Sequence, residues 1–343
     1  MSRVVEHLAE LTGFRDRDVL DVTLVGAFSD LLHTQTVAIY RCVGEPGHQH
    51  WLTRARMRPG DVAATADPLW VDLGSLPVLE AHPLRLACLK SEQTVSAMTD
   101  VATTCFALGT EQEIVGVLEL QTEQPLSECE LRTVGSILRV YRNFQGLLDY
   151  SERDSLTGLL NRKTFDERFL RVSTREAAPD LPPEPDGSRR QEQRAFYWLG
   201  VIDIDHFKRV NDNFGHLIGD EVLLLLARLM RSSFRFYDHL YRFGGEEFVA
   251  LMRCNSAADA AAAFERLRTN VERYVFPQVG QITVSVGFTA LRAGDAPAAA
   301  FDRADKAVYH AKQNGRNQVA DHAALVASGV FADAARDSDV ELF

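Results

Sequence analysis

Residues 240–252 read LYRFGGEEFVALM, two short apolar runs separated by two glycines and two acids. Each apolar run has the length and composition of a short β-strand. Between them, Gly244 and Gly245 can reach positive φ without a Cβ clash, as a tight reversal of the chain requires. This stretch therefore predicts a β-hairpin that carries Glu246 and Glu247 on its turn.

The elements around this hairpin follow a recurrent order. Residues 195–203 (AFYWLGVID) form an apolar run that ends in an acid, as in a buried strand whose C-terminal end meets solvent. A helical pattern at 220–232 has acids in its first turn and arginines toward its end, both favourable to the helix dipole. A helix, a strand and a helix are then predicted at 257–274, 282–290 and 298–314. The order β-α-β-β-α-β predicts a ferredoxin-like fold of the α/β (α+β) class, which hosts many functions.

Three acidic residues fall at one edge of this predicted sheet. Asp203 ends the first strand, and Glu246 and Glu247 lie on the hairpin turn. Adjacent central strands bring these carboxylates together, and a hard cation such as Mg²⁺ relieves their repulsion. A metal held there polarises a phosphate and lowers the pKa of an attacking hydroxyl. For any one of these acids alone, the alternative is a solvated loop side chain.

Five segments, in order and at matching spacing, resemble the diguanylate cyclase domain, also called the GGDEF domain. The turn is the GGEEF variant, with Glu246 in place of the aspartate at the third position. The resemblance covers residues 154–319 and implies a nucleotidyltransferase of the EC 2.7.7.65 type, which condenses two GTP molecules into cyclic di-GMP. The segments are DSLTGLLNR at 154–162, DIDHFK at 203–208 with its continuation to Asp220, RFGGEEF at 242–248, VSVG at 284–287, and ADKA through KQNGR at 304–316.

The resemblance implies a metal set and a catalytic set at the acidic residues. The metal site for Mg²⁺, with Mn²⁺ as the alternative ion, consists of Asp203, the Ile204 carbonyl, Glu246 and Glu247. Glu246 also assists deprotonation of the ribose 3′-hydroxyl. The implied catalytic residues are Glu246, Asp203 and Lys208.

The resemblance also implies how GTP is bound. Asn211 and Asp220 read the base, because a carboxylate accepts from the N1–H and the exocyclic amine of guanine, and adenine lacks this pair of donors. For Asn211 and Asp220 the alternative is a turn or capping role. For Lys312 and Arg316 the alternative is a solvated helix end. The implied phosphate contacts are the amides of Phe207 and Lys208, the backbone at Gly244 and Gly245, and the side chains of Lys208, Lys312 and Arg316.

One site holds one GTP, so the resemblance implies a homodimer whose two catalytic domains face each other antiparallel. Residues 127–153 are the expected signalling and dimerisation helix, because Ser127 and Glu130 form a capping box. We expect one apolar stripe to pack on the N-terminal module and the other to meet a second copy of the helix. A helix buried broadly against its own domain is the alternative. The stripes are Leu131, Val134, Leu138, Tyr141, Gln145 and Leu148, and Ile137, Val140, Phe144 and Leu147.

An inhibitory site is implied upstream of the turn. Arg235-Phe236-Tyr237-Asp238 stands at the family's spacing for an RxxD site, and Arg266 lies on the following helix. There Arg235 grips a phosphate or a guanine of cyclic di-GMP, and Asp238 takes the paired donors of guanine. The resemblance therefore predicts the product as an allosteric, noncompetitive inhibitor. A chance RxxD tetrad is the alternative.

Residues 1–126 are expected to form a sensory module. Strand patterns occur at 36–42, 51–57 and 113–121, and a helical pattern occurs at 18–33. This order of elements resembles a GAF domain. We expect the module to bind an unidentified ligand and to control the enzyme through the helix that follows.

Two further segments carry no predicted chemistry. Residues 176–194, rich in proline and charge, are predicted to form a surface loop within a catalytic domain at 154–322. Residues 323–343 are expected to be a C-terminal tail.

Composition narrows the classes of function. A net charge of −11 argues against broad nucleic-acid binding. Apolar runs are too short to cross a bilayer and the first residues do not read as a secretory signal, so we expect a cytoplasmic protein without membrane insertion. The 5 cysteines lack CxxC spacing and are expected to be reduced thiols.

Three other functions stay open. A binding module could sense GTP or cyclic di-GMP without turnover, although such domains usually lose an acid of the turn. A related cyclase would make a mixed or adenine-containing product, against which Asp220 argues. A pure interaction protein would not need this phosphate and metal set. No segment resembles a cyclic di-GMP phosphodiesterase, so we expect synthesis only.

Overall fold

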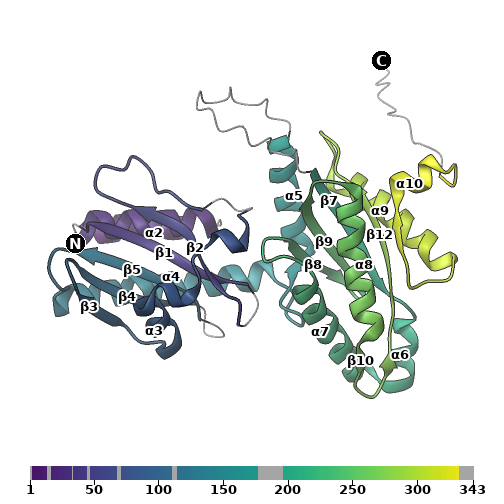
Figure 1. Cartoon of the computed structure of the whole chain (residues 1–343), viewed down its shortest axis with the longest axis horizontal. Coiled ribbons are helices and arrows are strands. Elements are labelled where there is room, and N and C mark those ends of the chain that lie inside the picture. The colour runs from purple at the N-terminus through teal and green to yellow at the C-terminus, as the bar shows by residue number, and fades with distance from the viewer. Residues whose placement is uncertain are drawn as a thin grey trace, which may run out of the picture. The chain divides into compact units, whose positions relative to one another are not determined.

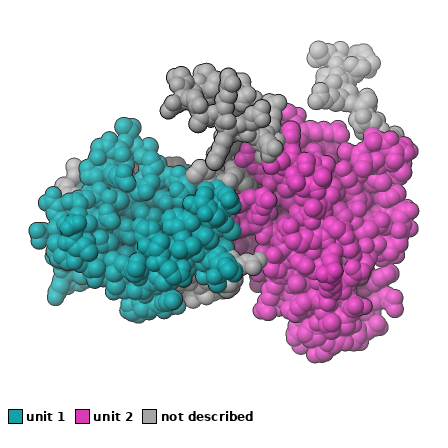
Figure 2. Space-filling view, viewed as in Figure 1, with its two compact units in different colours: residues 1–151 teal, residues 152–343 magenta. Residues whose placement is uncertain are grey.

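The chain forms two compact units, residues 1–151 (unit 1) and 152–343 (unit 2), which are coloured separately in Figure 2. Each unit is built on its own large sheet. The computed structural model describes residues 2–13, 17–32, 34–44, 47–67, 71–109, 114–176 and 196–331.

Unit 1 is built on a five-stranded antiparallel sheet in the order β2-β1-β5-β4-β3 (Figure 1). Helices α2 and α4 cover one face of this sheet with a large apolar cluster, and α3 covers the other face with a smaller one. The elements are α1 (Ser2–Gly13), α2 (Arg17–Leu32), β1 (Thr36–Val43), β2 (His50–Met57), α3 (Pro83–Ser91), β3 (Val95–Met98), β4 (Ala102–Gly109), β5 (Ile114–Thr122) and α4 (Glu128–Glu152).

The predicted strands at 36–42 and 51–57 are confirmed as β1 and β2, and the described part of the prediction at 113–121 is β5. Strands β3 and β4 were not predicted. Strand β4 lies between β5 and β3 and is buried along most of its length, so its sequence, ATTCFALG, lacks the alternation that marks a half-buried strand.

Helix α4 lies at the residues predicted to be helical and has the predicted capping box, whereas its connecting and dimerisation roles stay predictions. The Ser127 amide donates to the Glu130 carboxylate at 2.7 Å, and the Glu130 amide donates to Ser127 Oγ at 3.3 Å. The first stripe is largely buried on unit 1. The second stripe does not form a separate face, because its first members pack on the same core and Leu147 alone among them is exposed. The helix is therefore buried more broadly than the two-face prediction.

Unit 2 is built on a six-stranded sheet in the order β13-β12-β7-β9-β8-β6, in which the predicted order β-α-β-β-α-β is present. Helices α6, α7 and α8 pack on one face of the sheet, and α5 and α9 pack on the other (Figure 1). The elements are β6 (Leu160–Asn161), α5 (Arg162–Glu176), β7 (Phe196–Ile204), α6 (Phe207–Phe214), α7 (His216–Ser233), β8 (His239–Gly244), β9 (Glu247–Cys254), α8 (Ala257–Arg273), β10 (Val275–Phe276), β11 (Gly280–Gln281), β12 (Val284–Ala290), α9 (Pro297–Gln313), β13 (Val319–Asp321) and α10 (His322–Ala327).

Strand β7 is central and pairs antiparallel with β9 on one side and β12 on the other. Helix α9 approaches this part of the sheet closely at Gly287 of β12. A Cβ there would lie 2.2 Å from the Ala304 carbonyl oxygen, so only glycine allows the contact. This packing brings the C-terminal end of α9 toward the end of β7.

The helix predicted at 220–232 begins earlier and is preceded by a helix that was not predicted. Helix α7 starts at His216, so Asp220 lies inside it and the prediction of acids in its first turn is wrong. Gly215, with φ 84° and ψ 162°, separates α7 from α6. The single glycine breaks what would otherwise be one amphipathic pattern, and a non-helical φ at that point is easy for glycine.

The loop predicted at 176–194 lies outside the described residues except for Glu176, which ends α5. The tail expected at 323–343 is described as far as residue 331, and α10 occupies its start. In the described ranges, no helix has the length and apolarity that crossing a bilayer needs.

Candidate active site

The predicted acids meet where β7 ends and β9 begins, and Asp203, Glu246 and Glu247 are called the acidic edge below. In the antiparallel pairing of the two strands, Asp203 lies opposite Glu247. Glu246 directly precedes β9 on the turn formed by Gly244 (φ 138°) and Gly245 (φ 53°). The structure therefore brings these three carboxylates together through strand pairing, as the sequence predicted.

Asp203 is the most deeply placed of these acids, with 6% of its surface exposed. Its Oδ2 lies 2.7 Å from Nζ of Lys312, and its buried Oδ1 has no hydrogen-bond partner among the described residues. Burial raises the pKa of Asp203, and the contact with Lys312 opposes that shift. A buried acceptor without a donor is uncommon in folded proteins, so this oxygen marks a place where a ligand is expected.

The acidic edge fits a magnesium ion that shares its shell with a substrate. Burial raises the pKa of Glu246, and the charge of Asp203 adds to the effect. Within the described ranges, no group of three His, Cys, Asp or Glu side chains is arranged to hold a metal by itself. Mg²⁺ commonly uses one or two carboxylates plus substrate phosphates, which matches this donor set. Ile204, whose carbonyl was predicted as a further ligand, ends β7 beside Asp203.

Helix α6 offers its first-turn amides close to the acidic edge. It begins at Phe207, three residues after β7 ends, and His206 before it (φ 60°) makes no side-chain cap. Phe207 is buried, whereas Lys208 is exposed. Uncapped amides and the helix dipole favour an anion at a helix N-terminus. The two residues predicted to contact phosphates are therefore suitably placed.

The two residues predicted to read guanine are neighbours in space. Asn211 lies on α6, and a Cβ added at Gly219 of α7 would come within 2.0 Å of Asn211 Oδ1. Asp220 follows Gly219 and is exposed. Glycine at 219 thus leaves room for the Asn211 side chain next to Asp220, the second residue predicted to read the base.

The predicted phosphate-binding cations come from the end of α9. Lys312 lies in its last turn and reaches Asp203, as given above. Arg316 follows Gly315 with φ 63° and is exposed. Lys312 therefore contacts the acidic edge, and Arg316 lies on the turn that directly follows α9.

Sequence reasoning did not find the partners of Arg242. Its Nη1 donates to the two Asp154 carboxylate oxygens at 3.0 and 3.2 Å, and its Nη2 and Nε donate to the Gly245 carbonyl at 2.9 and 3.2 Å. Thr157 also donates to Asp154 from its amide and its hydroxyl. These contacts join the segment after α4 to the turn at Gly244 and Gly245. Asp154 and Arg242 stand in recognised segments, but their separation of 88 positions leaves no local signal of the pairing.

The residues predicted to form the inhibitory site also lie together. The Arg235 amide donates to Asp238 Oδ2 at 2.9 Å, and Arg235 Nη1 donates to the Tyr237 hydroxyl at 2.7 Å. Arg266 donates to the Ser233 carbonyl at 2.6 and 2.8 Å. Burial raises the pKa of Asp238 to about 6, and the charges of Arg235 and Arg266 oppose this. Among the described residues, nothing donates to the buried Oδ1 of Asp238.

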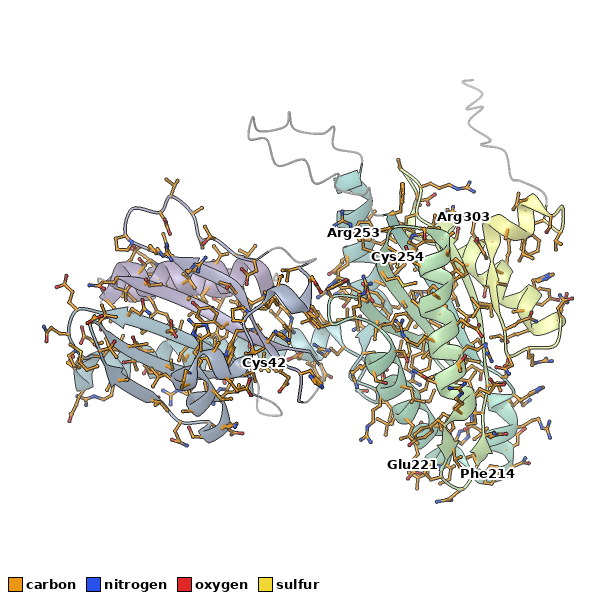
Figure 3. All side chains as sticks on the ribbon, viewed as in Figure 1. Cys42, Phe214, Glu221, Arg253, Cys254 and Arg303 are labelled. Atoms are coloured by element: carbon orange, nitrogen blue, oxygen red, sulfur yellow. The ribbon has the colours of Figure 1, made fainter. Side chains whose placement is uncertain are left out.

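This cluster is distant from the acidic edge. Asp238 accepts a hydrogen bond from the Arg253 amide, at the end of β9 opposite to Glu247. At about 3.3 Å per residue, the two ends of β9 are roughly 23 Å apart. In Figure 3, Arg253 and Cys254 lie at one end of unit 2, and Phe214 and Glu221 of α6 and α7 lie at the other.

Comparisons with known proteins identify the family of this unit. Residues 151–318 match the family described as "Diguanylate cyclase, GGDEF domain". Diguanylate cyclase DgcP of Pseudomonas aeruginosa is 41% identical over 169 residues, which are 48% of this chain and 23% of that protein. Response regulator PleD of Caulobacter vibrioides is 37% identical over 188 residues, 53% of this chain and 38% of that protein. The chain thus spans well under half the length of either relative.

Among solved structures, the GGDEF domain of DgcB from Caulobacter crescentus in complex with c-di-GMP shares 32% identity with this chain. The match covers 50% of this chain and 96% of that one, with a TM-score of 0.43. The GAF-like nature of residues 1–126 stays a prediction. Through the match of residues 151–318, unit 2 carries a GGDEF domain of the diguanylate cyclase family.

Proposed function

We propose that the chain is an active diguanylate cyclase, which condenses two GTP molecules into cyclic di-GMP and releases two pyrophosphates. The observation that carries this proposal is the state of Asp203. It is 6% exposed, one of its oxygens is held by Lys312, and the other has no partner in the described chain. Such an acid beside Glu246 needs a cation to satisfy it, and the cation needs phosphates to complete its shell.

The residues of the acidic edge and Lys312 have different roles in the proposed reaction. Asp203, Glu246, Glu247 and the Ile204 carbonyl would hold Mg²⁺. When bound, the ion supplies positive charge that polarises the attacked phosphate. Glu246 accepts the proton of the 3′-hydroxyl, a role suited to a carboxyl whose pKa is raised by burial. Lys312 is close enough to the acidic edge to neutralise a triphosphate there.

The first-turn amides and the base-reading pair orient the substrate. The amides of Phe207 and Lys208 receive the β- and γ-phosphates, and the flexible backbone of Gly244 and Gly245 admits the α-phosphate. Asn211 and Asp220, brought together across Gly219, select guanine. Catalysis on this scheme is mostly positioning plus electrostatic stabilisation.

The reaction requires a homodimer, because each 3′-hydroxyl attacks the α-phosphate of the other GTP. Exposed apolar side chains near the end of α4 support this part of the proposal. Leu147 is 66% exposed and Tyr150 is 88% exposed, and burial of such side chains against a second copy of the helix is favourable. The helix therefore offers a short apolar surface to a partner.

Product inhibition at Arg235, Asp238 and Arg266 is part of the proposal. The buried Oδ1 of Asp238 has no donor within the described ranges, and guanine supplies a pair of donors. Because the cluster lies at the far end of β9, inhibition is expected to be noncompetitive with GTP. Replacement Arg235→Ala should abolish inhibition by cyclic di-GMP and leave the KM for GTP unchanged, and persistence of inhibition would refute the site.

Control by unit 1 is also part of the proposal. Helix α4 ends at Glu152, two residues before Asp154, and Asp154 binds Arg242, which in turn binds the Gly245 carbonyl. A change in α4 thus has a short hydrogen-bonded route to the catalytic turn.

Incubation of the full chain with GTP and Mg²⁺, followed by chromatography of the nucleotides and a pyrophosphate assay, tests the activity. We expect cyclic di-GMP and two pyrophosphates per product, activity with Mn²⁺ in place of Mg²⁺, none after chelation, and no product from ATP alone. Binding of GTP without pyrophosphate release would instead identify a receptor that has lost turnover.

A further inference from the structure

A second aspartate, Asp205, lies two residues from Asp203 and has a different environment. It is 5% exposed. Its Oδ1 accepts from the Ser285 hydroxyl at 2.7 Å, and its Oδ2 accepts from the Thr283 hydroxyl at 2.7 Å and from the Asn317 amide at 3.0 Å. Both oxygens are therefore occupied by donors from the chain itself, whereas only one oxygen of Asp203 is.

The turn that contributes the Asn317 amide has an unusual backbone. Gly315, Arg316 and Asn317 have φ of 109°, 63° and 46° in succession. For residues other than glycine this region is energetically unfavourable, so such a run persists where surrounding contacts hold it. Arg316 and Asn317 are therefore in a conformation that needs external support.

The side chain of Asn317 supplies part of this support. Its Nδ2 donates to Glu272 Oε1 at 2.7 Å, and its Oδ1 accepts from Arg268 Nη1 at 2.8 Å, both at the end of α8. Its amide is held by Asp205. Asn317 thus joins α8 to the residues just beyond β7.

This anchoring point lies beside the cations of the candidate site. Lys312, in the last turn of α9, contacts Asp203, and Arg316 immediately precedes Asn317. The end of α9 and its turn are consequently fixed to the tip of β7 at two places, once through Lys312 and once through Asn317. If the second is released, the left-handed turn can relax and the direction in which it presents Arg316 can change.

We propose that Asp205 and Asn317 form a latch, defined as the hydrogen bond from the backbone amide of Asn317 to the Asp205 carboxylate. In this role Asp205 is a positioning residue: it orients Arg316 and Lys312 for the triphosphate and touches neither substrate nor metal. The proposal rests on the proposed function, because it assigns those two cations to GTP. A carboxylate suits the role because it only accepts hydrogen bonds and three donors converge on it.

Two single replacements in the full chain test the latch. Asp205→Asn keeps the shape but introduces a donor among three donors, and Asn317→Ala removes the side-chain anchor of the turn. Each is expected to raise the KM for GTP about tenfold with kcat changed less than about twofold, the pattern of lost substrate binding. Because both variants release the same turn, each by removing one of its two supports, the double variant should resemble either single variant.

Binding and exchange measurements separate the latch from the proposed activity. Titration with a non-hydrolysable GTP analogue should show the same tenfold weakening even if the parent chain proves inactive. Hydrogen exchange should show loss of protection at the Asn317 amide in Asp205→Asn. Asp302→Asn, an exposed acid on α9 paired with Lys306, is the matched control and should leave all these quantities unchanged.

Specific outcomes would overturn the latch. If analogue binding and KM are unchanged in both variants, Asp205 has no positioning role. If Asp205→Asn lowers kcat and Mn²⁺ affinity with KM unchanged, it acts as a metal ligand instead. If it fails to fold, Ser285→Ala and Asn317→Ala carry the test, and a lower melting temperature without a change in analogue affinity would reduce Asp205 to a structural residue.

Discussion

Buried acids in the two units differ in how many of their carboxylate oxygens have a hydrogen-bond donor. In unit 1, Glu119 is 6% exposed and accepts from Arg85 Nε at 2.7 Å and Nη2 at 3.0 Å. Asp21 is 1% exposed, accepts from the Tyr141 hydroxyl and lies 3.6 Å from Arg41. These acids join elements to one another: α3 to β5 in the first case, and α2 to α4 in the second.

In unit 2, Asp203 is as buried as Glu119 but has a donor at one oxygen only. Burial raises the pKa of Asp203, and the contact with Lys312 opposes this only in part. The comparison shows that burial alone does not separate structural acids from functional ones. An oxygen without a hydrogen-bond partner does separate functional acids from structural ones, because an unpaired buried oxygen destabilises the fold unless a ligand completes the site.

The largest expected effect comes from removing a charge at the acidic edge. Glu246→Gln keeps the size of the side chain but neither binds a cation nor accepts a proton, so kcat should fall about a thousandfold. Stability should be equal or higher, because burial raises the pKa of Glu246 and the neutral amide escapes that penalty. Steady-state pyrophosphate release and thermal melting measure the two quantities.

Glu167→Gln is the control for this replacement, since Glu167 is an exposed acid on α5. Both its turnover and its melting temperature should match the parent. Equal turnover in Glu246→Gln and the parent would remove the basis for treating the unsatisfied acids as functional.

A smaller effect, on stability, is expected where the acid is fully paired. Arg85→Met leaves the buried Glu119 carboxylate without its partner and removes the guanidinium that lies 3.5 Å from the Tyr40 ring centroid. Breaking one side of a buried pair costs about 3 kcal/mol. The free energy of unfolding of unit 1 should fall by that amount, with its denaturant midpoint at lower concentration, as followed by circular dichroism of the full chain.

The double replacement Arg85→Met with Glu119→Leu distinguishes the two kinds of acid. An apolar pair of similar volume can replace a buried ion pair at little cost, so most of the lost stability should return. The corresponding change at the acidic edge, Asp203→Leu with Lys312→Met, should restore no activity. If the double variant in unit 1 is as unstable as Arg85→Met, the ion pair itself stabilises unit 1, and the instability of Arg85→Met does not come from an unpaired Glu119.

The sequence predicted those features of unit 2 that depend on local patterns. Two adjacent glycines predicted the hairpin, and an apolar run ending in Asp203 predicted β7 and the place of the acids. Helix α6 was missed because it is short and because the break at Gly215 is not distinguishable from a tolerated glycine within a longer helix. The roles of the residues named for GTP and metal remain predictions.

The pairings that distinguish the acids could not be predicted. Asp205 meets Ser285 across 80 positions and Asn317 across 112 positions, and Arg85 meets Glu119 across 34. Periodicity describes which face of an element is buried, but not which polar groups on two elements will meet. Whether an acid is satisfied is therefore a property of the fold that its own segment does not encode.

The smallest expected effect concerns Asp238, which like Asp203 has a buried oxygen without a hydrogen-bond partner among the described residues. Burial raises its pKa from 3.8 to about 6, so the folded protein binds this proton more tightly than the unfolded chain. Between about pH 4 and pH 6 stability should therefore fall as pH rises, and the penalty is complete above that range. Asp238→Asn does not ionise, so at pH 8 it should be more stable than the parent by about 1 kcal/mol, after allowance for screening of a partly exposed group. At pH 4 the two proteins should melt together, and parallel melting curves from pH 4 to pH 8 would show that Asp238 is satisfied in solution and belongs with the paired acids of unit 1.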